Sequence, residues 1–466
     1  MNPDPSPRAV DLPWSRREFI KTTGLAVGAA SVLGATGTLS AAQGTSPKPG
    51  SKLRIAIVGV GGRGVHHVRA YAKEQIVAFC DVNRSTENTT GLGWYTTIKE
   101  PLERFPDVPL FEDYRVMLRK MGDSIDAVSI ATPDHMHFPI AKACIEAGKH
   151  VLVEKPLTHT VWEARELLRL AQKHGVVTQM GNQGHANEGT RLVREWVQAG
   201  VLGDIREVFH WTNRPVWEQG PRRIDHSNGA PKIPKELNWN LWQGVAREQA
   251  YDPAYLPFEW RGWWEYGCGA LGDMACHVMD SAFWALDLGY PETIEASATS
   301  FNEWSAPKTS HVIYQFPARG SMPPVTVHWF DGDLKPPIPA HVPRDFDFGT
   351  SGTFLVGSEM TAHTPEYSES VRLYPTEKFM EVRPKLPPKT IPRIKDSNHF
   401  QEFIDACKGG PACGSRFEYS APFTETVLLG NIAIRAKQRL QYDAERAQFT
   451  NSDYANSLLT KSYRSF

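Results

Sequence analysis

The chain has 466 residues, of which 41% are hydrophobic and 22% are charged, and its formal net charge is −1. This composition is typical of a folded globular protein that is long enough for two or three hydrophobic cores. A net charge near zero gives no electrostatic attraction to nucleic acid or to an anionic membrane, so we expect neither as a partner.

The first 42 residues are predicted to be a targeting segment and not part of the fold. The stretch SRREFIK at 15–21 is followed by a run of small, moderately apolar residues that ends in LSAAQG. An arginine pair, a moderately apolar region and a small-residue cleavage site together are typical of a twin-arginine signal peptide. An amphipathic or disordered N-terminus is the alternative. The sequence therefore predicts export, to the periplasm or beyond, and no membrane contact once the leader is removed.

Residues 52–180 alternate between apolar runs and helical patterns. Buried strands are predicted at 53–60, 75–82, 125–132, 150–156 and 176–183, and helices at 137–149 and 161–175. Strands separated by helices imply a parallel sheet with right-handed crossovers and helices on both faces. The predicted fold class of this part is α/β, as a Rossmann domain.

Residues 181–440 show a different pattern, which predicts a second, α+β domain. A helix at 187–200 precedes loops rich in proline and tryptophan that run to 266, and another helix begins near Asp273. Strands are predicted at 293–301, 310–317, 324–330, 353–358 and 370–375, with a loop at 333–350. Because no helix separates these strands, we expect an antiparallel sheet. Helices are predicted at 397–409 and 424–440, and residues 441–466 are expected to form a C-terminal tail.

The first predicted strand runs into a glycine-rich turn of the form G-x-G-x-x-G. Gly59, Gly61 and Gly64 open a predicted helix, and Asp81 ends the next strand. Such a turn brings backbone amides close to a pyrophosphate, and an acidic residue about twenty positions on binds the ribose of NAD and repels the 2′-phosphate of NADP. Asp81 could instead be a turn residue, and Arg84 could accommodate a phosphate. The loop residues expected at the cofactor, NAD in preference to NADP, are Gly59, Gly61, Gly62, Arg63 and Gly64.

Polar residues follow three later strands, at the edge where ligands of open α/β sheets bind. They lie in ATPDHMH (131–137), EKP (154–156) and GNQGH (181–185). Lys155 is a candidate catalytic or positioning cation, although its position alone favours a surface lysine in a turn. Asn182 and Gln183 could equally be amides that brace a loop. The cofactor-contact candidates from these strand ends are Thr132, Pro133, His137, Glu154, Lys155, Asn182 and Gln183.

The stretch EYGCGALGDMACHVMDSAFWAL (265–286) carries a second group of candidates. Asp273 and His277 are four residues apart on a predicted helix and therefore share one face. A carboxylate next to an imidazole fixes its tautomer, which would let His277 exchange a proton with a substrate hydroxyl near neutral pH. The alternatives are a helix N-cap for Asp273 and a hydrogen-bonded core residue for His277. The six cysteines, including Cys268 and Cys276, show no metal-binding spacing, so we expect free thiols and no metal site.

The motifs G-x-G-x-x-G, TPDHxH, EKP and G-A-L-x-D-x-x-x-H-x-x-D, in this order, resemble the glucose–fructose oxidoreductase/inositol dehydrogenase (Gfo/Idh/MocA) family over about residues 52–440. The resemblance implies an N-terminal Rossmann domain, a C-terminal domain with an open antiparallel sheet, and a sugar or polyol bound between them. It also implies that Lys155 and His277 handle protons beside Asp273, and that open sheets pair in a homo-oligomer. Asp280 completes the last motif and is expected to pair with backbone or an arginine.

Clues to the substrate are weaker. Seven of the 14 tryptophans fall between Trp211 and Trp264. Aromatic faces pack on the C–H faces of sugars, and arginine can hydrogen-bond their hydroxyls, although buried scaffold aromatics are an equal alternative. The substrate-contact candidates are Lys155, Arg214, Trp260, Arg261, Asp273 and His277.

These features predict an exported NAD(P)-dependent oxidoreductase that transfers hydride between a carbinol carbon of a sugar or polyol and a nicotinamide. Because the twin-arginine route carries folded proteins, the NAD would travel with the protein and would be useful outside only if it does not dissociate. The resembled family also contains NAD-dependent glycosidases, so the alternative is a redox-neutral glycosidase or lyase that oxidises a ring carbon transiently. The glycosidase motif Y-x-T-H-G-x-G is absent. A non-enzymatic sugar sensor is disfavoured because Lys155 and His277 are both present.

Overall fold

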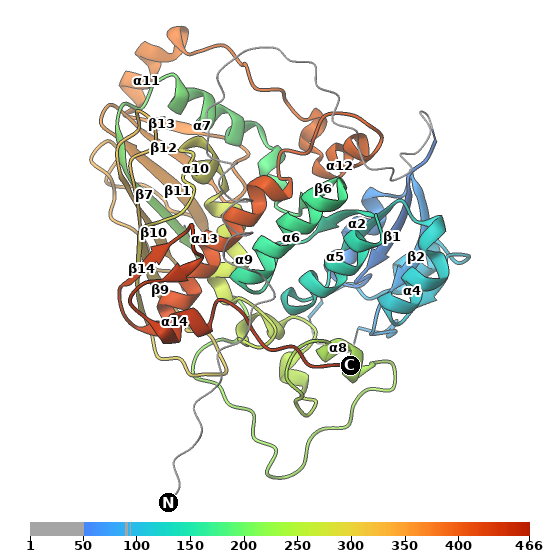
Figure 1. Ribbon diagram of the computed structural model, residues 1–466. Coiled ribbons are helices and arrows are strands. Elements are labelled where there is room, and N and C mark those ends of the chain that lie inside the picture. The colour runs from blue at the N-terminus through green and yellow to red at the C-terminus, as the bar shows by residue number, and fades with distance from the viewer. Residues whose placement is uncertain (1–50, 89–91, 94) are drawn as a thin grey trace, which may run out of the picture.

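The computed structural model describes residues 51–88, 92–93 and 95–466, so the predicted signal peptide lies outside the described residues. Two sheets lie side by side, with helices α6, α9 and α13 between them (Figure 1). No helix in the described ranges is both long and apolar enough to cross a membrane.

The first sheet is parallel, as the sequence predicted, and has six strands in the order β3-β2-β1-β4-β5-β6, of which β3 was not among the five predicted strands. Its strands are β1 (Arg54–Val58), β2 (Gln75–Cys80), β3 (Leu110–Phe111), β4 (Ala127–Ile130), β5 (His150–Val153) and β6 (Thr178–Met180). Its helices are α2 (Arg63–Ala70), α3 (Lys99–Arg104), α4 (Tyr114–Met121), α5 (His137–Glu146) and α6 (Val161–His174). The predicted Rossmann topology is confirmed.

Side chains alternate across strand β1 and enter two separate cores. Ala56 and Val58 belong to the core that includes α5 and α6, whereas Ile55 and Ile57 pack with residues of α2 and of α12 (His399–Cys407). Helices therefore cover both faces of the sheet, and one of them comes from a part of the chain that lies more than two hundred residues later.

The second sheet has nine strands in the order β13-β12-β11-β7-β10-β9-β8-β14-β15. Its strands are β7 (Ile205–Thr212), β8 (Thr293–Ala298), β9 (Ser310–Phe316), β10 (Val325–Phe330), β11 (Ser351–Gly357), β12 (Thr361–Pro365), β13 (Arg372–Tyr374), β14 (Leu440–Asp443) and β15 (Gln448–Phe449). The sheet is mostly antiparallel, as predicted, with the exception that β7 and β10 pair in parallel. A parallel pair needs a long crossover, and the loops and helices between residues 212 and 293 supply it.

The helices of this part are α7 (Glu188–Gln198), α8 (Trp239–Gln243), α9 (Gly269–Val278), α10 (Asp280–Ala285), α11 (Thr376–Val382), α12, α13 (Phe417–Ala436) and α14 (Asp453–Ser457). Helix α9 begins four residues before Asp273, which corrects the predicted start. Helix α13 covers 417–436 and not 424–440, because Lys437 adopts a left-handed conformation (φ 54°) and Leu440 already belongs to β14.

Helix α13 joins the two sheets. It packs against α6, α9 and β8, and its buried Glu425 accepts hydrogen bonds from Arg165 Nε and Nη2, both at 2.6 Å. The region beyond 440, predicted to be a tail, contains β14, β15 and α14 and then runs back to the first domain near α8 (Figure 1). The last residues thus contact helices α4 and α6 of the first domain.

Candidate active site

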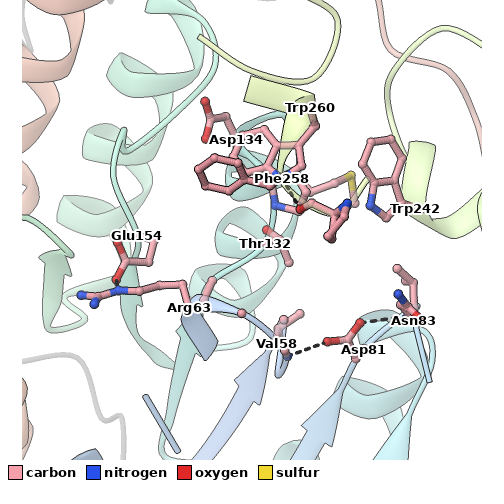
Figure 2. A pocket seen from close by; sticks show the side chains of 18 of the residues that line it. Val58, Arg63, Asp81, Asn83, Thr132, Asp134, Glu154, Trp242, Phe258 and Trp260 are labelled. Atoms are coloured by element: carbon pink, nitrogen blue, oxygen red, sulfur yellow. Dashed lines mark hydrogen bonds and ion pairs between the residues drawn. The ribbon is translucent and has the colours of Figure 1, made fainter. Parts of the chain in front are cut away.

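A pocket lies at the carboxyl ends of the parallel strands, with a wall from both domains and a volume of about 400 Å³. Figure 2 shows Arg63 and Glu154 on one side, Asp81 below, and the rings of Trp242, Phe258 and Trp260 opposite. The sequence-predicted contact residues that line it are Gly59, Gly61, Gly62, Arg63, Asp81, Thr132, Pro133, Glu154, Lys155, Gln183, Arg214, Trp260, Arg261, Asp273 and His277.

The glycine-rich loop has the backbone geometry of a dinucleotide turn. Gly59 has φ +80°, and a Cβ there would lie 2.7 Å from the carbonyl carbon of Ala131, just after β4. A Cβ on Gly64 would lie 1.8 Å from Gly59 O, so only glycine lets α2 pack so closely on the turn. Gly64 therefore shapes the loop without lining the pocket, whereas Gly61 and Gly62 line it.

Asp81 closes the loop on the side of β2. Its carboxylate accepts hydrogen bonds from the amides of Val60 (2.7 Å), Gly61 (3.2 Å) and Asn83 (2.9 Å). Burial raises the pKa of Asp81 above its ordinary value, and these amides oppose the rise. Arg84, the alternative phosphate partner, is exposed and does not line the pocket. This end of the pocket therefore presents the acidic residue and not the arginine.

Glu154, at the end of β5, is held by two basic side chains next to the loop. Its Oε1 accepts a hydrogen bond from Arg63 Nε at 2.7 Å and lies 2.9 Å from His67 Nε2. Burial opposes its ionisation, but Arg63 and His67 hold the pKa of Glu154 well below its ordinary value. The Arg63–Glu154 ion pair connects α2 to the end of β5 and fixes the Arg63 guanidinium at the pocket wall (Figure 2).

Lys155 and Asp273 form a salt bridge between the two domains. Lys155 Nζ donates to Oδ1 and to the backbone O of Asp273, both at 2.7 Å, and Arg261 Nε donates to the same Oδ1 at 3.1 Å. The Arg261 guanidinium lies 4.3 Å from the ring centroids of both Phe258 and Trp260. Burial opposes ionisation, but Lys155 and Arg261 hold the pKa of Asp273 far below its ordinary value. Asp273 is therefore an anion that fixes two cations at the wall.

The expected pairing of Asp273 with His277 is not formed, because the Asp273 carboxylate is turned to Lys155 and Arg261. The His277 ring packs edge-on against Tyr367, with 4.9 Å between centroids, and its Nδ1 is buried without a hydrogen-bond partner in the described part of the chain. Burial, together with the Lys155 charge, lowers the pKa of His277 well below its ordinary value. His277 is therefore neutral at neutral pH. The N-cap alternative for Asp273 is also wrong, because this residue lies inside α9.

Besides Gly64, two predicted cofactor contacts lie outside the pocket wall. The ring nitrogens of His137 lie 2.7 Å from Pro156 O and 2.8 Å from Thr132 O, so the ring connects two loops. Asn182 Oδ1 accepts a hydrogen bond from Ser415 Oγ, and its Nδ2 is buried with no hydrogen-bond partner among the described residues. Both side chains support strand ends whose neighbours line the pocket.

Asp280, the last residue of the helix motif, pairs with side chains that the sequence did not suggest. Its carboxylate lies 3.0 Å from His185 Nδ1 and accepts a hydrogen bond from the Tyr419 hydroxyl. The expectation of a backbone or arginine partner is therefore wrong, and Asp280 braces α10 against α13.

The six cysteines are buried free thiols, Cys268 and Cys276 included, as predicted. Within the ranges that the structure describes, no group of three or more His, Cys, Asp and Glu side chains is arranged to hold a metal ion.

The tryptophan-rich loops form a core of their own. Trp239, Trp242, Trp260 and Trp263 pack in one buried cluster with two tyrosines, which agrees with the scaffold interpretation. Trp242 and Trp260 also line the pocket. For these two rings the structural and the binding interpretations therefore apply together.

Several pocket residues were not among the candidates that the sequence suggested. Tyr95, Met136, Phe258, Tyr367 and Phe466 line the pocket, and each comes from a loop, a short turn or the end of the described chain. Met136 lies inside the ATPDHMH motif, but no motif or periodicity marks the other four positions, because tertiary folding alone brings them to the strand ends.

The residues present fit a nicotinamide dinucleotide. The loop glycines leave backbone open to the pocket, and Arg63 stands beside them. Two buried polar atoms of the wall, Thr132 Oγ1 and His277 Nδ1, lack hydrogen-bond partners among the described residues. Unpartnered buried polar atoms are costly, and a polar ligand in the pocket would be placed to satisfy them.

Two family models match the chain. Residues 53–182 match the NAD-binding Rossmann fold of the Gfo/Idh/MocA oxidoreductase family, and residues 193–318 match the C-terminal alpha/beta domain of the same family. Together the two matches cover more than half of the chain.

Among curated relatives, the chain is 25% identical over 230 residues to levoglucosan dehydrogenase from Pseudarthrobacter phenanthrenivorans, covering 49% of this chain and 50% of that protein. It is 30% identical over 254 residues to glycosyl hydrolase family 109 protein 2 from Shewanella sp. strain ANA-3, covering 49% and 52%. The chain thus spans about half the length of these relatives.

Among solved structures, the fold is similar to that of the WlbA dehydrogenase from Bordetella pertussis in complex with NADH and UDP-GlcNAcA. The TM-score is 0.57 at 16% identity, over 84% of this chain and 99% of that one. Both domains are therefore matched in order, by family model and by fold. The chain belongs to the Gfo/Idh/MocA family of oxidoreductases, with an NAD-binding Rossmann fold.

Proposed function

We propose that this protein is an NAD(P)-dependent oxidoreductase that oxidises a carbinol group of a sugar or polyol. The observation that carries the proposal is the position of Lys155, Asp273 and His277 on the wall of the dinucleotide pocket. Lys155 follows β5 and Asp81 follows β2, so β1 and β4 separate the chemical end from the ribose end. A dehydrogenase relative named for levoglucosan and a fold relative bound to a nucleotide sugar support a carbohydrate substrate.

The chain's own residues can handle the proton of such an oxidation. A bound nicotinamide dinucleotide would supply the hydride chemistry. His277 is neutral and can accept the hydroxyl proton of the substrate. Asp273 holds the Lys155 ammonium at the wall, where it can donate a hydrogen bond to the substrate oxygen as that oxygen becomes a carbonyl. Arg214, Trp260 and Arg261 line the same pocket as substrate contacts.

The cofactor, NAD in preference to NADP, is proposed to stay on the protein. Purified and extensively dialysed protein should then release about one NAD(H) per chain on denaturation, measured by mass spectrometry, and its activity should need no added nucleotide. A second sugar would serve as the electron acceptor. Gly59→Ala is the control, because a Cβ there meets the Ala131 carbonyl, and this variant should purify with little nucleotide. Wild-type protein that purifies empty and works only with stoichiometric added NAD would contradict retention.

A redox-neutral glycosidase or lyase is the second candidate, favoured by the 30% identity to a glycosyl hydrolase family 109 protein. The absence of Y-x-T-H-G-x-G counts against that particular activity. Release of a nitrophenol from nitrophenyl glycosides, with no net change in bound NAD(H), would favour this candidate. Net reduction of the bound cofactor by a free sugar would favour the dehydrogenase.

We also propose export by the twin-arginine route. The support is the sequence alone, since residues 1–50 lie outside the described residues. Replacing both Arg16 and Arg17 with lysine should abolish periplasmic accumulation, because the pathway recognises the guanidinium groups and not charge alone. Cell fractionation and immunoblotting measure this, and an unchanged periplasmic fraction would refute the assignment.

A homo-oligomer is proposed through the outer face of the nine-stranded sheet. Residues of β9 and β10 alternate between buried and half-buried, and the half-buried set includes His311, Ile313, His328 and Phe330. Light scattering of the purified protein measures its molar mass, and a mass equal to that of one chain would exclude the proposal.

A further inference from the structure

We propose that residues 461–466 form a strap that closes the adenosine end of the pocket and slows release of the dinucleotide, with Phe466 as the strap residue that contacts it. This inference rests on the proposed function, since it concerns the same bound cofactor. It adds a binding element that comes from outside the Rossmann domain.

The strand order identifies the adenosine end. Asp81 follows β2, and its carboxylate is the expected partner of the ribose next to the adenine. Strand β3 pairs with the outer edge of β2, so the residues after β3 extend the pocket beyond Asp81. Asn83, Tyr114 and Phe466 all line the pocket. Because Phe466 contacts Arg115, the neighbour of Tyr114, it lies on the β3 side of the pocket, whereas Lys155 follows β5.

Arg115 of α4 holds Phe466 in place. Its Nη1 donates a hydrogen bond to Phe466 O at 2.6 Å, and its guanidinium lies 4.2 Å from the centroid of the Phe466 ring. Asp113 in turn accepts hydrogen bonds from Arg115 Nε and Nη2 at 2.8 to 3.1 Å. The ring is thus fixed from the backbone side and from one face.

Arg464 attaches the strap to helix α8. Its guanidinium donates to Asn240 O (2.8 Å), to Asn240 Oδ1 (2.7 Å), and to Gly244 O and Ala246 O (both 3.2 Å). Its backbone N–H donates to Val245 O at 3.1 Å. Helix α8 supplies Leu241 and Trp242 to the pocket wall, so the strap also fixes that part of the wall.

A third attachment is made at the start of α6. The Tyr463 hydroxyl donates a hydrogen bond to Glu163 Oε1, and Lys461 Nζ lies 3.5 Å from the same oxygen and 2.8 Å from His159 Nδ1. Glu163 is fully buried. The segment leaves the second domain after α14 and crosses to the first domain close to α8 (Figure 1). Release of the cofactor past Phe466 would therefore require several of these contacts to open together.

The strap is tested by nucleotide binding and release, not by turnover. Bound NAD is replaced by an excess of isotopically heavier NAD, and mass spectrometry follows the exchange. Phe466→Ala should raise the exchange rate roughly tenfold or more, which is the scale of losing one aromatic contact to a base. Its Kd for NADH, from the fluorescence of bound NADH, should rise by a similar factor. Arg464→Met, which frees the segment from α8, should act in the same direction.

Two control variants test whether the effect is specific to loss of the Phe466 ring. Phe466→Tyr keeps the aromatic ring and should stay close to wild type, whereas Met380→Ala alters an exposed apolar residue of α11 that does not line the pocket. Circular dichroism should show that every variant is folded.

The outcomes separate the strap from the proposed function. Equal release rates and equal Kd values for wild type and Phe466→Ala would overturn the strap alone. Tighter binding in Phe466→Ala would also overturn it, because the ring would then obstruct the site. Wild-type protein that purifies without nucleotide and binds no added NADH would overturn the proposed function, and the strap with it.

Discussion

Replacing Lys155 with methionine is expected to slow the reduction of bound nicotinamide by substrate by roughly 10²–10⁴-fold, the scale on which a positioned proton-transfer group contributes. Methionine keeps much of the side-chain length but removes the ammonium that Asp273 holds at the pocket wall through two 2.7 Å contacts. Lys155→Arg should also be slow, because a planar guanidinium does not reproduce the position of a compact ammonium. The measurement is the single-turnover rate constant with the sugar that the protein oxidises.

Lys142→Met is the matched control for this change. Lys142 lies on α5 and forms a surface ion pair with Glu146. The control should keep the wild-type rate, and both variants should keep their bound nucleotide. A Lys155→Met rate within a few-fold of wild type would remove Lys155 from the chemistry.

Replacing His277 with glutamine should slow the same step by roughly 10²–10⁴-fold, because glutamine cannot accept a proton from a hydroxyl. The pH profile gives a second signature. Burial and the Lys155 charge hold the pKa of His277 well below its ordinary value, so the neutral, proton-accepting ring persists into acid. The wild-type rate should fall only as the pH drops through that lowered pKa, and His277→Gln should lose this acid limb.

His174→Gln is the control for the histidine change, because His174 ends α6 and does not line the pocket. Nucleotide content of His277→Gln should match wild type, since the residue lies in the second domain. A variant that keeps near-wild-type rates, or keeps the acid limb unchanged, would exclude His277 as the proton acceptor.

Local patterns in the sequence were sufficient for five of the six strands of the parallel sheet and missed the two-residue β3. The apolar runs before Gly59 and before Asp81 correspond to β1 and β2, and the helix signals before Gly175 correspond to α6. Strand pairing in the second domain was harder to predict from the sequence, because paired strands there are far apart along the chain. β7 joins β10 in parallel across more than a hundred residues, and no periodicity encodes that partner.

The sequence predicted which residues belong to the candidate site, but not which of them contact one another. Spacing placed Asp273 and His277 on one helical face, yet the Asp273 carboxylate turns to Lys155 and Arg261, two cations from other elements. A buried carboxylate is stabilised most by such charges, and their proximity exists only in the folded chain. The position of Phe466 could not be predicted either, because no sequence pattern near it indicates that this residue returns to the first domain.

The central claim is tested most directly by mixing purified protein with excess sugars and polyols in a stopped-flow instrument, without added nucleotide. The account predicts a single-turnover rise in the near-ultraviolet absorbance of reduced nicotinamide, with an amplitude of about one per chain, for at least one member of a broad panel. No rise with any sugar or polyol, from protein shown by mass spectrometry to hold oxidised NAD, would contradict it.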